Sequence, residues 1–289
     1  GGSGIGPHAR PPSGITDVEG GTDTAARGRG GSLAPMPRLL VRRPSPRLAE
    51  GELTHIARVP VDAALAQRQW ESYVDVFRQR GWDVVEVAPA DEHADGVFIE
   101  DAVVMFGDLA VLTSPGAESR RGEIASTRST LEGAGIPYRA IELPGTLDGG
   151  DVLKIGRTVY VGRTLRTNDE GVTHLRDLLA PRGWSVVGVP VSKVLHLKSG
   201  VTALPDGTVV GFEPLVDDPA AYPDFLAVPE EHGTAVVVLD DATVLMSADA
   251  PETAELYRSR GLEVITTPIT EFEKLEGCVT CLSVRVRDE

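Results

Sequence analysis

The sequence predicts one closed α/β domain built from repeated strand–hairpin–helix–strand units. Four times along the chain, two short β-rich runs are separated by a turn, and in most copies a helical stretch and another strand follow. A lone strand is also expected at each end of this pattern, at 39–42 and 282–287, and the two could pair to complete a ring. A doubly wound sheet is the alternative, but hairpins fit it poorly because parallel strands need helical crossovers.

The first elements are a strand at 39–42, a helix over 61–80 and a strand at 82–87. Apolar residues recur along that helix at helical spacing, which gives it one face to bury. Gly81 follows the last periodic residue and provides the stop. The apolar face consists of Ala66, Trp70, Tyr73, Val74 and Phe77.

The repeated units each begin with a predicted hairpin. The third contains Asp206-Gly207, a strong signal for a tight turn between two strands. The last helix is expected to end at Gly261. The four hairpins are expected at 103–113, 151–162, 200–212 and 235–246, and the helices at about 119–132, 168–179 and 251–260.

The N-terminal segment, residues 1–35, differs from the rest in composition. It contains ten Gly and four Pro, no aromatic residue and no periodic apolar pattern. Such a segment cannot bury enough surface to offset its ordering entropy, so a disordered extension or an expression remnant is expected. The folded domain is expected over 36–289, with Met36 as a candidate native start.

The charge balance narrows the classes of partner. The chain has 43 acidic and 28 basic residues and a net charge of −15, which argues against nucleic acid and mildly favours a cationic substrate. No apolar run approaches the ~20 residues that span a bilayer, and no signal peptide precedes the domain, so no membrane partner is expected. Two cysteines are too few for a disulfide scaffold, which predicts a cytoplasmic protein.

Polar residues stand at equivalent positions of the repeat. Glu100-Asp101 precedes the first hairpin, Asp148 the second and His196 the third, and Cys281 precedes the final strand. In a ring of equivalent units, such positions converge on one axis. Carboxylates, an imidazole and a thiol should therefore meet at one site, although they lie far apart in sequence.

Each of these residues also has a structural interpretation. Cys278 and Cys281 could be a redox pair or half a zinc site, but no second C-x-x-C or H-x-x-x-H exists, and a redox pair normally opens a helix, not the strand expected at Cys281. A buried, inert thiol is the ordinary alternative. A lone histidine in an apolar run is usually a core residue, an aspartate in L-D-G-G-D suits a turn, and single arginines are usually solvated surface charges.

Six motifs occur along the chain: GVFIED (96–101), SPGAESRR (114–121), LDGGDVL (147–153), RTN (166–168), LHLKSG (195–200) and EGCVTCLSV (276–284). In order and spacing, from about 39 to 287, they resemble the dimethylarginine dimethylaminohydrolase family. The resemblance implies the pentein fold, a five-bladed αβ propeller of ββαβ-type units around a central active site, with 36–289 as one catalytic domain. It also implies hydrolysis of Nω-methylated arginine to citrulline and dimethylamine or methylamine through a covalent thiouronium intermediate.

The same resemblance assigns roles to individual residues. Cys281 matches the nucleophile, His196 the general acid and base, and Asp148 the carboxylate that orients the histidine. The family's double cysteine is Cys281-Leu282 here, and the early loop 44–55 diverges. The matched substrate-binding positions are Asp95, Glu100 and Asp101 at the guanidinium and neighbouring groups, Arg120 and Arg166 at the α-carboxylate, Leu275 by a main-chain contact and Leu53 in the 44–55 loop.

Neither a cofactor nor a metal is implied by the resemblance, and zinc held by Cys281 and His196 would be inhibitory. The expected partner is a small cationic substrate, bound by a monomer or a homodimer.

Arginine deiminase and amidinotransferase chemistry, which would use the same cysteine, histidine and carboxylates, remain alternatives. From a different class, the chain could be a C-x-x-C redox protein, a metal-binding protein or a cation-binding module without turnover.

Overall fold

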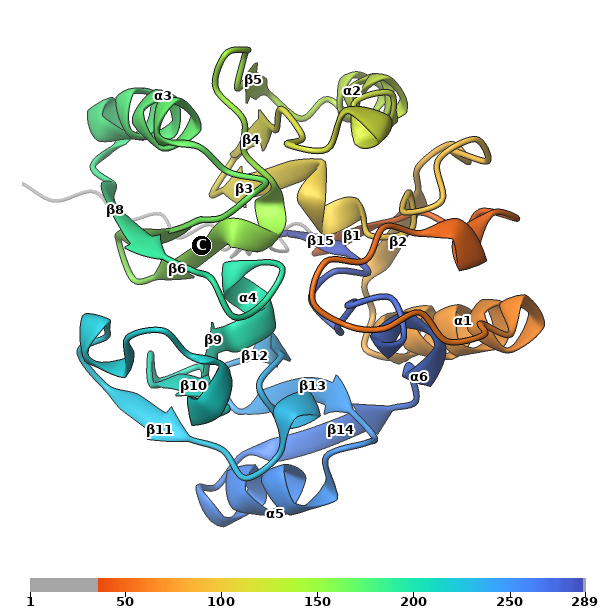
Figure 1. Ribbon diagram of the computed structural model, residues 1–289, viewed down its shortest axis with the longest axis vertical. Coiled ribbons are helices and arrows are strands. Elements are labelled where there is room, and N and C mark those ends of the chain that lie inside the picture. Colours follow the sequence, from red (N-terminus) through yellow and green to blue (C-terminus); the bar gives the residue numbers. More distant parts are fainter. Residues whose placement is uncertain (1–35, 288–289) are drawn as a thin grey trace, which may run out of the picture. The chain divides into compact units, whose positions relative to one another are not determined.

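The computed structural model describes residues 36–287, and within them fifteen short strands form five three-stranded sheets. The prediction for residues 1–35 concerns a segment outside the described residues. Within 36–287 the sheets follow one another around a common centre, as Figure 1 shows. No helix in this range is long and apolar enough to cross a membrane.

Every sheet has the same pattern of pairing. Its first two strands are antiparallel, and its third strand is parallel to the second. The four sheets that begin with a hairpin confirm the four predicted repeats. Their strands are β3 (Val103–Phe106), β4 (Leu109–Leu112) and β5 (Tyr138–Ala140); β6 (Val152–Ile155), β7 (Thr158–Arg163) and β8 (Ser185–Pro190); β9 (Val201–Ala203), β10 (Val209–Gly211) and β11 (Phe225–Ala227); and β12 (Val236–Asp240), β13 (Thr243–Ser247) and β14 (Glu263–Thr267).

The fifth sheet joins the two ends of the repeat. Strand β15 (Val284–Val286) pairs antiparallel with β1 (Arg38–Val41), and β2 (Asp83–Glu86) runs parallel to β1. This pairing confirms the expectation that the lone strands could meet. It also supplies the fifth repeat, whose first strand comes from the opposite end of the chain and therefore leaves no hairpin in the sequence.

Four helices connect the second and third strands of their sheets and lie at the outside in Figure 1. Gly81 and Gly261, which follow two of them, have φ of 80° and 89°, a left-handed conformation that ends a helix at little cost for glycine. Short 3-10 turns replace the helix in the β9–β10–β11 sheet. The helices are α1 (Ala63–Gln79), α2 (Glu123–Gly133), α3 (Asp169–Leu179) and α5 (Pro251–Ser259).

The buried apolar residues form five clusters, and each cluster joins neighbouring sheets. The one that joins the β12–β13–β14 sheet to the terminal sheet, for example, contains Leu39 and Val41 of β1 with Val237 of β12 and Phe77 of α1. Because apolar burial is the main stabilising term, each sheet depends on both neighbours for its core. Packing of this kind favours a closed ring over independent units.

A short helical turn precedes the first strand of several sheets and places polar residues at the centre. These turns are η2 (Ile99–Asp101), η4 (Gly149–Asp151) and α4 (Leu197–Gly200). Cys281 precedes the final strand as expected, but that strand is shorter than the predicted 282–287, since β15 begins only at Val284. Cys281 lies in a turn in which its N–H donates to the Cys278 carbonyl at 3.1 Å.

Candidate active site

His196 lies between two carboxylates at the centre of the ring. Its side chain is buried, with Nε2 at 3.0 Å from Oδ2 of Asp148 and Nδ1 at 3.7 Å from Oδ1 of Asp101. The three residues come from three successive repeats, where each stands at the short turn before a first strand. The structure therefore brings together these three predicted site residues.

Close packing at the centre explains the L-D-G-G-D motif. The Gly150 N–H donates to Oδ1 of Asp101 at 2.9 Å. A Cβ atom on Gly150 would lie 2.7 Å from Nδ1 of His196 and 2.8 Å from that same carboxylate oxygen. Glycine is required here because the backbone approaches two site residues at once.

Asp151 is a site residue that the sequence interpretation missed, although the motif contained it. Its carboxylate accepts hydrogen bonds from the hydroxyls of Thr164 and Thr167, at 2.7 and 2.6 Å, and from the Leu197 N–H at 2.9 Å. It thereby fixes the backbone beside His196. Burial raises the pKa of Asp151 to about 6.

The surrounding charges hold His196 in its protonated form. Burial opposes ionisation, but the carboxylates of Asp101, Asp151 and Asp148 outweigh it and raise the pKa of His196 to about 9. Burial likewise opposes ionisation of Asp101, yet His196 and Arg120 lower its pKa to about 2. At neutral pH the centre therefore contains an imidazolium beside the ionised carboxylate of Asp101.

Arg120 and Arg166 are buried, which corrects the interpretation of single arginines as surface charges. Arg120 donates to Oδ2 of Asp101 at 2.6 Å and, through Nε and Nη2, to both oxygens of Glu123 at 2.9 Å. Nη1 of Arg166 lies 3.5 Å from Oδ2 of Asp148, and its Nη2 donates to Glu52 at 3.1 Å. Arg120 is thus held by protein carboxylates, whereas Arg166 is partnered by a residue of the 44–55 loop.

Cys281 lies in the turn before β15 and is buried. Its carbonyl accepts the Glu100 N–H at 3.2 Å, and its Sγ lies 3.2 Å from Sγ of Cys278. The hydrogen bond with Cys278 raises the pKa of the Cys281 thiol, and burial and the carboxylates of Glu100 and Asp101 add to this. The thiol form is therefore favoured at neutral pH.

Glu100 points toward a different set of partners from its neighbour Asp101. Its carboxylate accepts hydrogen bonds from Lys198 at 2.5 Å, Thr280 at 2.9 Å and Arg285 at 3.3 Å. These contacts connect η2, α4 and the turn that holds Cys281. The side chain of Glu100 therefore braces three of the central turns against one another.

The remaining predicted residues lie at the 44–55 loop. Asp95 accepts the Glu52 N–H at 3.0 Å, and burial raises the pKa of Asp95. Leu275 is buried and Leu53 half-buried, and both pack with the apolar cluster that includes Cys281.

Glu276, which the sequence interpretation did not single out, secures the same loop. Its carboxylate accepts the N–H groups of Thr54 and His55 at 2.7 and 2.8 Å. Its own φ of 59° is unusual for a residue other than glycine. This backbone conformation marks Glu276 as an unusual residue. It can be recognised only in the folded chain, so no sequence pattern indicated it.

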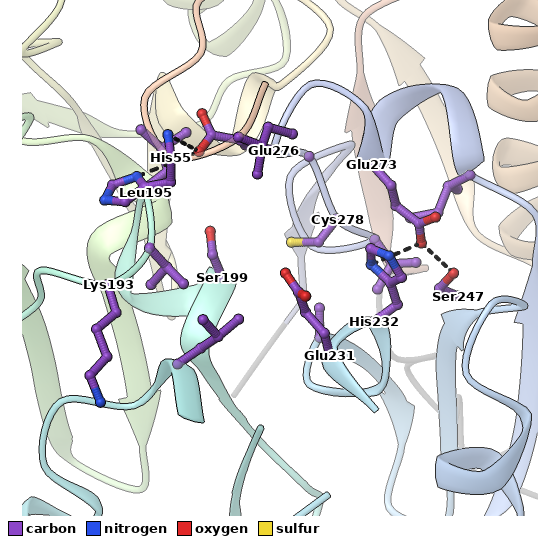
Figure 2. Close-up of a pocket in the computed structure, with 17 residues that line it drawn as sticks. His55, Lys193, Leu195, Ser199, Glu231, His232, Ser247, Glu273, Glu276 and Cys278 are labelled. Atoms are coloured by element: carbon purple, nitrogen blue, oxygen red, sulfur yellow. Dashed lines mark hydrogen bonds and ion pairs between the residues drawn. The ribbon is translucent and has the colours of Figure 1, made fainter. Parts of the chain in front are cut away.

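A cavity of about 310 Å³ lies next to these residues (Figure 2). Three carboxylates line it, from Glu231, Glu273 and Glu276, and the sulfur of Cys278 points into it. Such a volume is at the lower end of small-molecule sites. The lining carboxylates favour a cationic ligand.

Asp101, Asp148 and His196 also satisfy the spacing of a metal site, since one ligand atom from each lies within 4.8 Å of the others. A metal requires a neutral imidazole, however, and here the pKa of His196 is raised to about 9. Each oxygen of Asp101 also already accepts a hydrogen bond, one from Arg120 and one from the Gly150 N–H. The donor set therefore fits a hydrogen-bonded acid–base network better than a metal centre.

Five ββαβ-type repeats that place a cysteine, a histidine and carboxylates at their central turns define a pentein-type protein. A dimethylarginine dimethylaminohydrolase structure from Pseudomonas aeruginosa, a cysteine-to-serine variant complexed with citrulline, has a TM-score of 0.80 at 31% identity and covers 86% of this chain and 99% of that one. The N-terminal domain of a cyanobacterial arginine dihydrolase has a TM-score of 0.75 at 21% identity, covers 87% of this chain and 98% of that one, and shares the fold. A scan against protein-family models finds no match.

Sequence relatives give the particular family. The dimethylarginine dimethylaminohydrolase of Streptomyces coelicolor is 57% identical over 254 residues, which is 88% of this chain and 98% of that protein. The enzyme of the same name from Pseudomonas aeruginosa is 33% identical over 86% of this chain and 98% of that protein. The chain belongs to the dimethylarginine dimethylaminohydrolase family.

Proposed function

We propose that this chain hydrolyses Nω-methylated arginine to citrulline and dimethylamine or methylamine. The observation that carries the proposal is the buried Asp101–His196–Asp148 network at the centre of the ring, with Cys281 at the equivalent turn of a further repeat. The names of the two relatives and the citrulline complex of the Pseudomonas aeruginosa enzyme agree with this reaction.

The carboxylates would bind and orient the substrate. A guanidinium is planar and presents parallel N–H donors, which suit bidentate hydrogen bonds to a carboxylate. Asp101 and Asp148 supply buried carboxylates beside His196, so the guanidinium carbon would face the thiol. Glu100 would add negative charge, with its oxygens accepting from Lys198, Thr280 and Arg285. The oxygens of Asp101 and Asp148 also accept protein hydrogen bonds, so the guanidinium would use their remaining lone pairs.

Substrate binding would itself promote ionisation of Cys281. The pKa of this thiol is raised by its hydrogen bond with Cys278, by burial and by nearby carboxylates. A bound guanidinium cation places a positive charge beside the sulfur and so favours the thiolate. The nucleophile would then form chiefly when a substrate is present.

His196 would act first as an acid. The Cys281 sulfur attacks the guanidinium carbon, the bond from that carbon to the methylated nitrogen breaks, and the departing amine takes the proton of the imidazolium. Neutral His196 then accepts a proton from water, which attacks the thiouronium carbon. The C–S bond of the resulting adduct then breaks, the adduct's hydroxyl proton passes to the sulfur, and citrulline leaves with Cys281 restored as the thiol. The proton that Cys281 released to solvent on substrate binding balances the one that the free amine takes up.

The amino-acid end of the substrate would bind near the 44–55 loop. Arg166 is the better placed of the two arginines for the α-carboxylate, because its Nη2 donates to the partly exposed Glu52, whereas Arg120 is held by buried Asp101 and Glu123. Arg120 would position Asp101. Asp95 and the main chain of Leu275 would accept from the α-ammonium, with Leu53 covering the site.

The proposed reaction uses groups of one chain and requires neither a cofactor nor a second subunit, so a monomer or a homodimer would serve equally. Zinc bound by Cys281 and His196 would block the nucleophile and inhibit. Nucleic acid has no role in the reaction.

The test is citrulline release from dimethylarginine, monomethylarginine and free arginine, with Cys281→Ser as the matched variant. We expect the wild type to release citrulline from both methylated substrates and Cys281→Ser to release none. Release from arginine alone would move the activity to a deiminase, and release from none of them would reject the hydrolase assignment.

A further inference from the structure

Two thiols lie in contact at the proposed nucleophile. Sγ of Cys278 and Sγ of Cys281 are 3.2 Å apart, and neither cysteine is in a disulfide. The Cys281 N–H donates to the Cys278 carbonyl at 3.1 Å, which closes a four-residue turn. Such turns keep their end Cα atoms within about 7 Å, and disulfides span about 4.4–6.8 Å between Cα atoms. Small side-chain rotations would therefore suffice to join the two sulfurs.

The two thiols differ in access. Cys281 is buried, whereas Cys278 is half-buried and its sulfur projects into the 310 Å³ cavity (Figure 2). The hydrogen bond from Cys281 lowers the pKa of Cys278, and Thr280 adds a further hydrogen bond at 3.2 Å. The reachable sulfur is thus also the one that ionises more readily, a combination typical of redox-reactive cysteines.

A metal is a weaker explanation for this pair. A zinc site needs three or four ligands, and across residues 36–287 no third histidine, cysteine or carboxylate group completes a ligand cluster with the two thiols. Reactivity between the sulfurs needs no further ligand.

We propose that Cys278 and Cys281 form a reversible oxidation site for small hydroperoxides, with Cys278 as the reacting thiol and Cys281 as the resolving one. The loss of activity on oxidation rests on the proposed function, in which Cys281 is the nucleophile. The disulfide itself does not depend on that function.

The chemistry balances with one peroxide. The Cys278 thiolate attacks an oxygen of the peroxide, the O–O bond breaks, and the leaving oxygen departs as water or an alcohol after taking a proton. Cys278 is now a sulfenic acid. The Cys281 sulfur attacks it, the S–O bond breaks, and the hydroxyl leaves as water with the Cys281 proton. The two thiols are oxidised to a disulfide, and the peroxide is reduced.

The experiment compares the reduced wild type with Cys278→Ser, since serine keeps the size of the side chain and removes its sulfur. Each protein is treated with hydrogen peroxide, and intact mass, free thiols and citrulline release are followed before and after dithiothreitol. We expect the wild type to lose both thiols and its activity together and to recover both on reduction. Relative to its own starting activity, Cys278→Ser should be inactivated roughly tenfold more slowly than the wild type, because its remaining thiol is buried and poorly ionised.

Cys281→Ser is the second variant, because it leaves the reacting thiol without a resolving partner. We expect a sulfenic acid on Cys278 that dimedone traps. Equal rates of inactivation for wild type and Cys278→Ser, or oxidised wild type with both thiols still free, would overturn the proposal. Since mass and thiol counts do not require turnover, disulfide formation without any citrulline release would reject the proposed function alone.

Discussion

The centre of the ring and the 44–55 loop both contain charged groups in contact, but the groups at the centre are all buried, whereas the loop contributes a partly exposed carboxylate. At the centre, Asp101, Asp148 and His196 are each at most 3% exposed. Backbone N–H groups donate to Asp101 and Asp148, and the two carboxylates hold His196. At the loop, Glu52 is paired with Arg166 while its side chain is 44% exposed. The centre is therefore preorganised, whereas the loop contact can be exchanged for a substrate.

The difference has an energetic basis. Buried charges in a low-dielectric site interact strongly, and losing one partner leaves the other uncompensated. An exposed ion pair is screened by water and usually contributes less than about 1 kcal/mol. Substitutions at the centre should accordingly have large effects on rate and stability, and substitutions at the loop small effects on binding.

The largest expected effect comes from Asp148→Asn. The amide keeps the size of the side chain but removes a charge that raises the pKa of His196 and orients its ring. We expect kcat to fall by roughly 10²–10⁴-fold, the range over which a positioned acid–base group usually contributes. Steady-state citrulline release measures it. Asp108→Asn, at an exposed hairpin position, is the control, and a similar kcat for both variants would remove Asp148 from the mechanism.

The second effect concerns stability against pH. The pKa of folded His196 is about 9 against an ordinary 6.5, so its stabilising contribution is complete below about pH 6.5 and is lost as the pH rises through 9. The difference in pKa corresponds to roughly 3 kcal/mol. Denaturant unfolding gives the free energy of unfolding of wild type and of His196→Gln at each pH. The difference between the two proteins should shrink by that amount, roughly 3 kcal/mol, as the pH rises from below about 6.5 to above 9. Parallel pH curves for the two proteins would show that His196 is not ionised at the centre.

The comparison also explains what the sequence could predict. Four hairpins and the helices followed from apolar periodicity and turn residues, which are local signals. The pairing of the terminal strands followed from closing the repeats into a ring. Asp101, Asp148 and His196 could be placed together because a ring superimposes equivalent positions of its repeats. The role of Glu52 had no such signal, since its partner Arg166 is 114 residues away. The burial of Arg120 likewise depends on Glu123 and Asp101 meeting around it, which no single-residue pattern reveals.

Gly150→Ala probes the packing of the centre without changing its charge. The added methyl group would lie 2.7 Å from Nδ1 of His196 and 2.8 Å from Oδ1 of Asp101, so one of them must move. Overpacking of this kind usually costs roughly 1–3 kcal/mol, which denaturant unfolding can measure.

Gly133→Ala is the matched control for that substitution. It lies at the end of α2 and meets no atom within 4 Å, so it should be neutral or slightly stabilising. Equal stability of the two variants would mean that the centre tolerates rearrangement and is not preorganised.

The smallest effect is expected at the loop. Glu52 pairs with Arg166, which we propose binds the α-carboxylate of the substrate. The substrate must therefore displace Glu52 from Arg166. Glu52→Gln removes the competing charge and should lower KM by up to about fivefold, the equivalent of about 1 kcal/mol for a pair of which only Glu52 is exposed, with kcat nearly unchanged. Glu50→Gln, whose carboxylate pairs with exposed Arg47, is the control and should leave both constants as they are. A higher KM for Glu52→Gln would instead mean that Glu52 binds the α-ammonium, and the loop would then belong to the fixed part of the site.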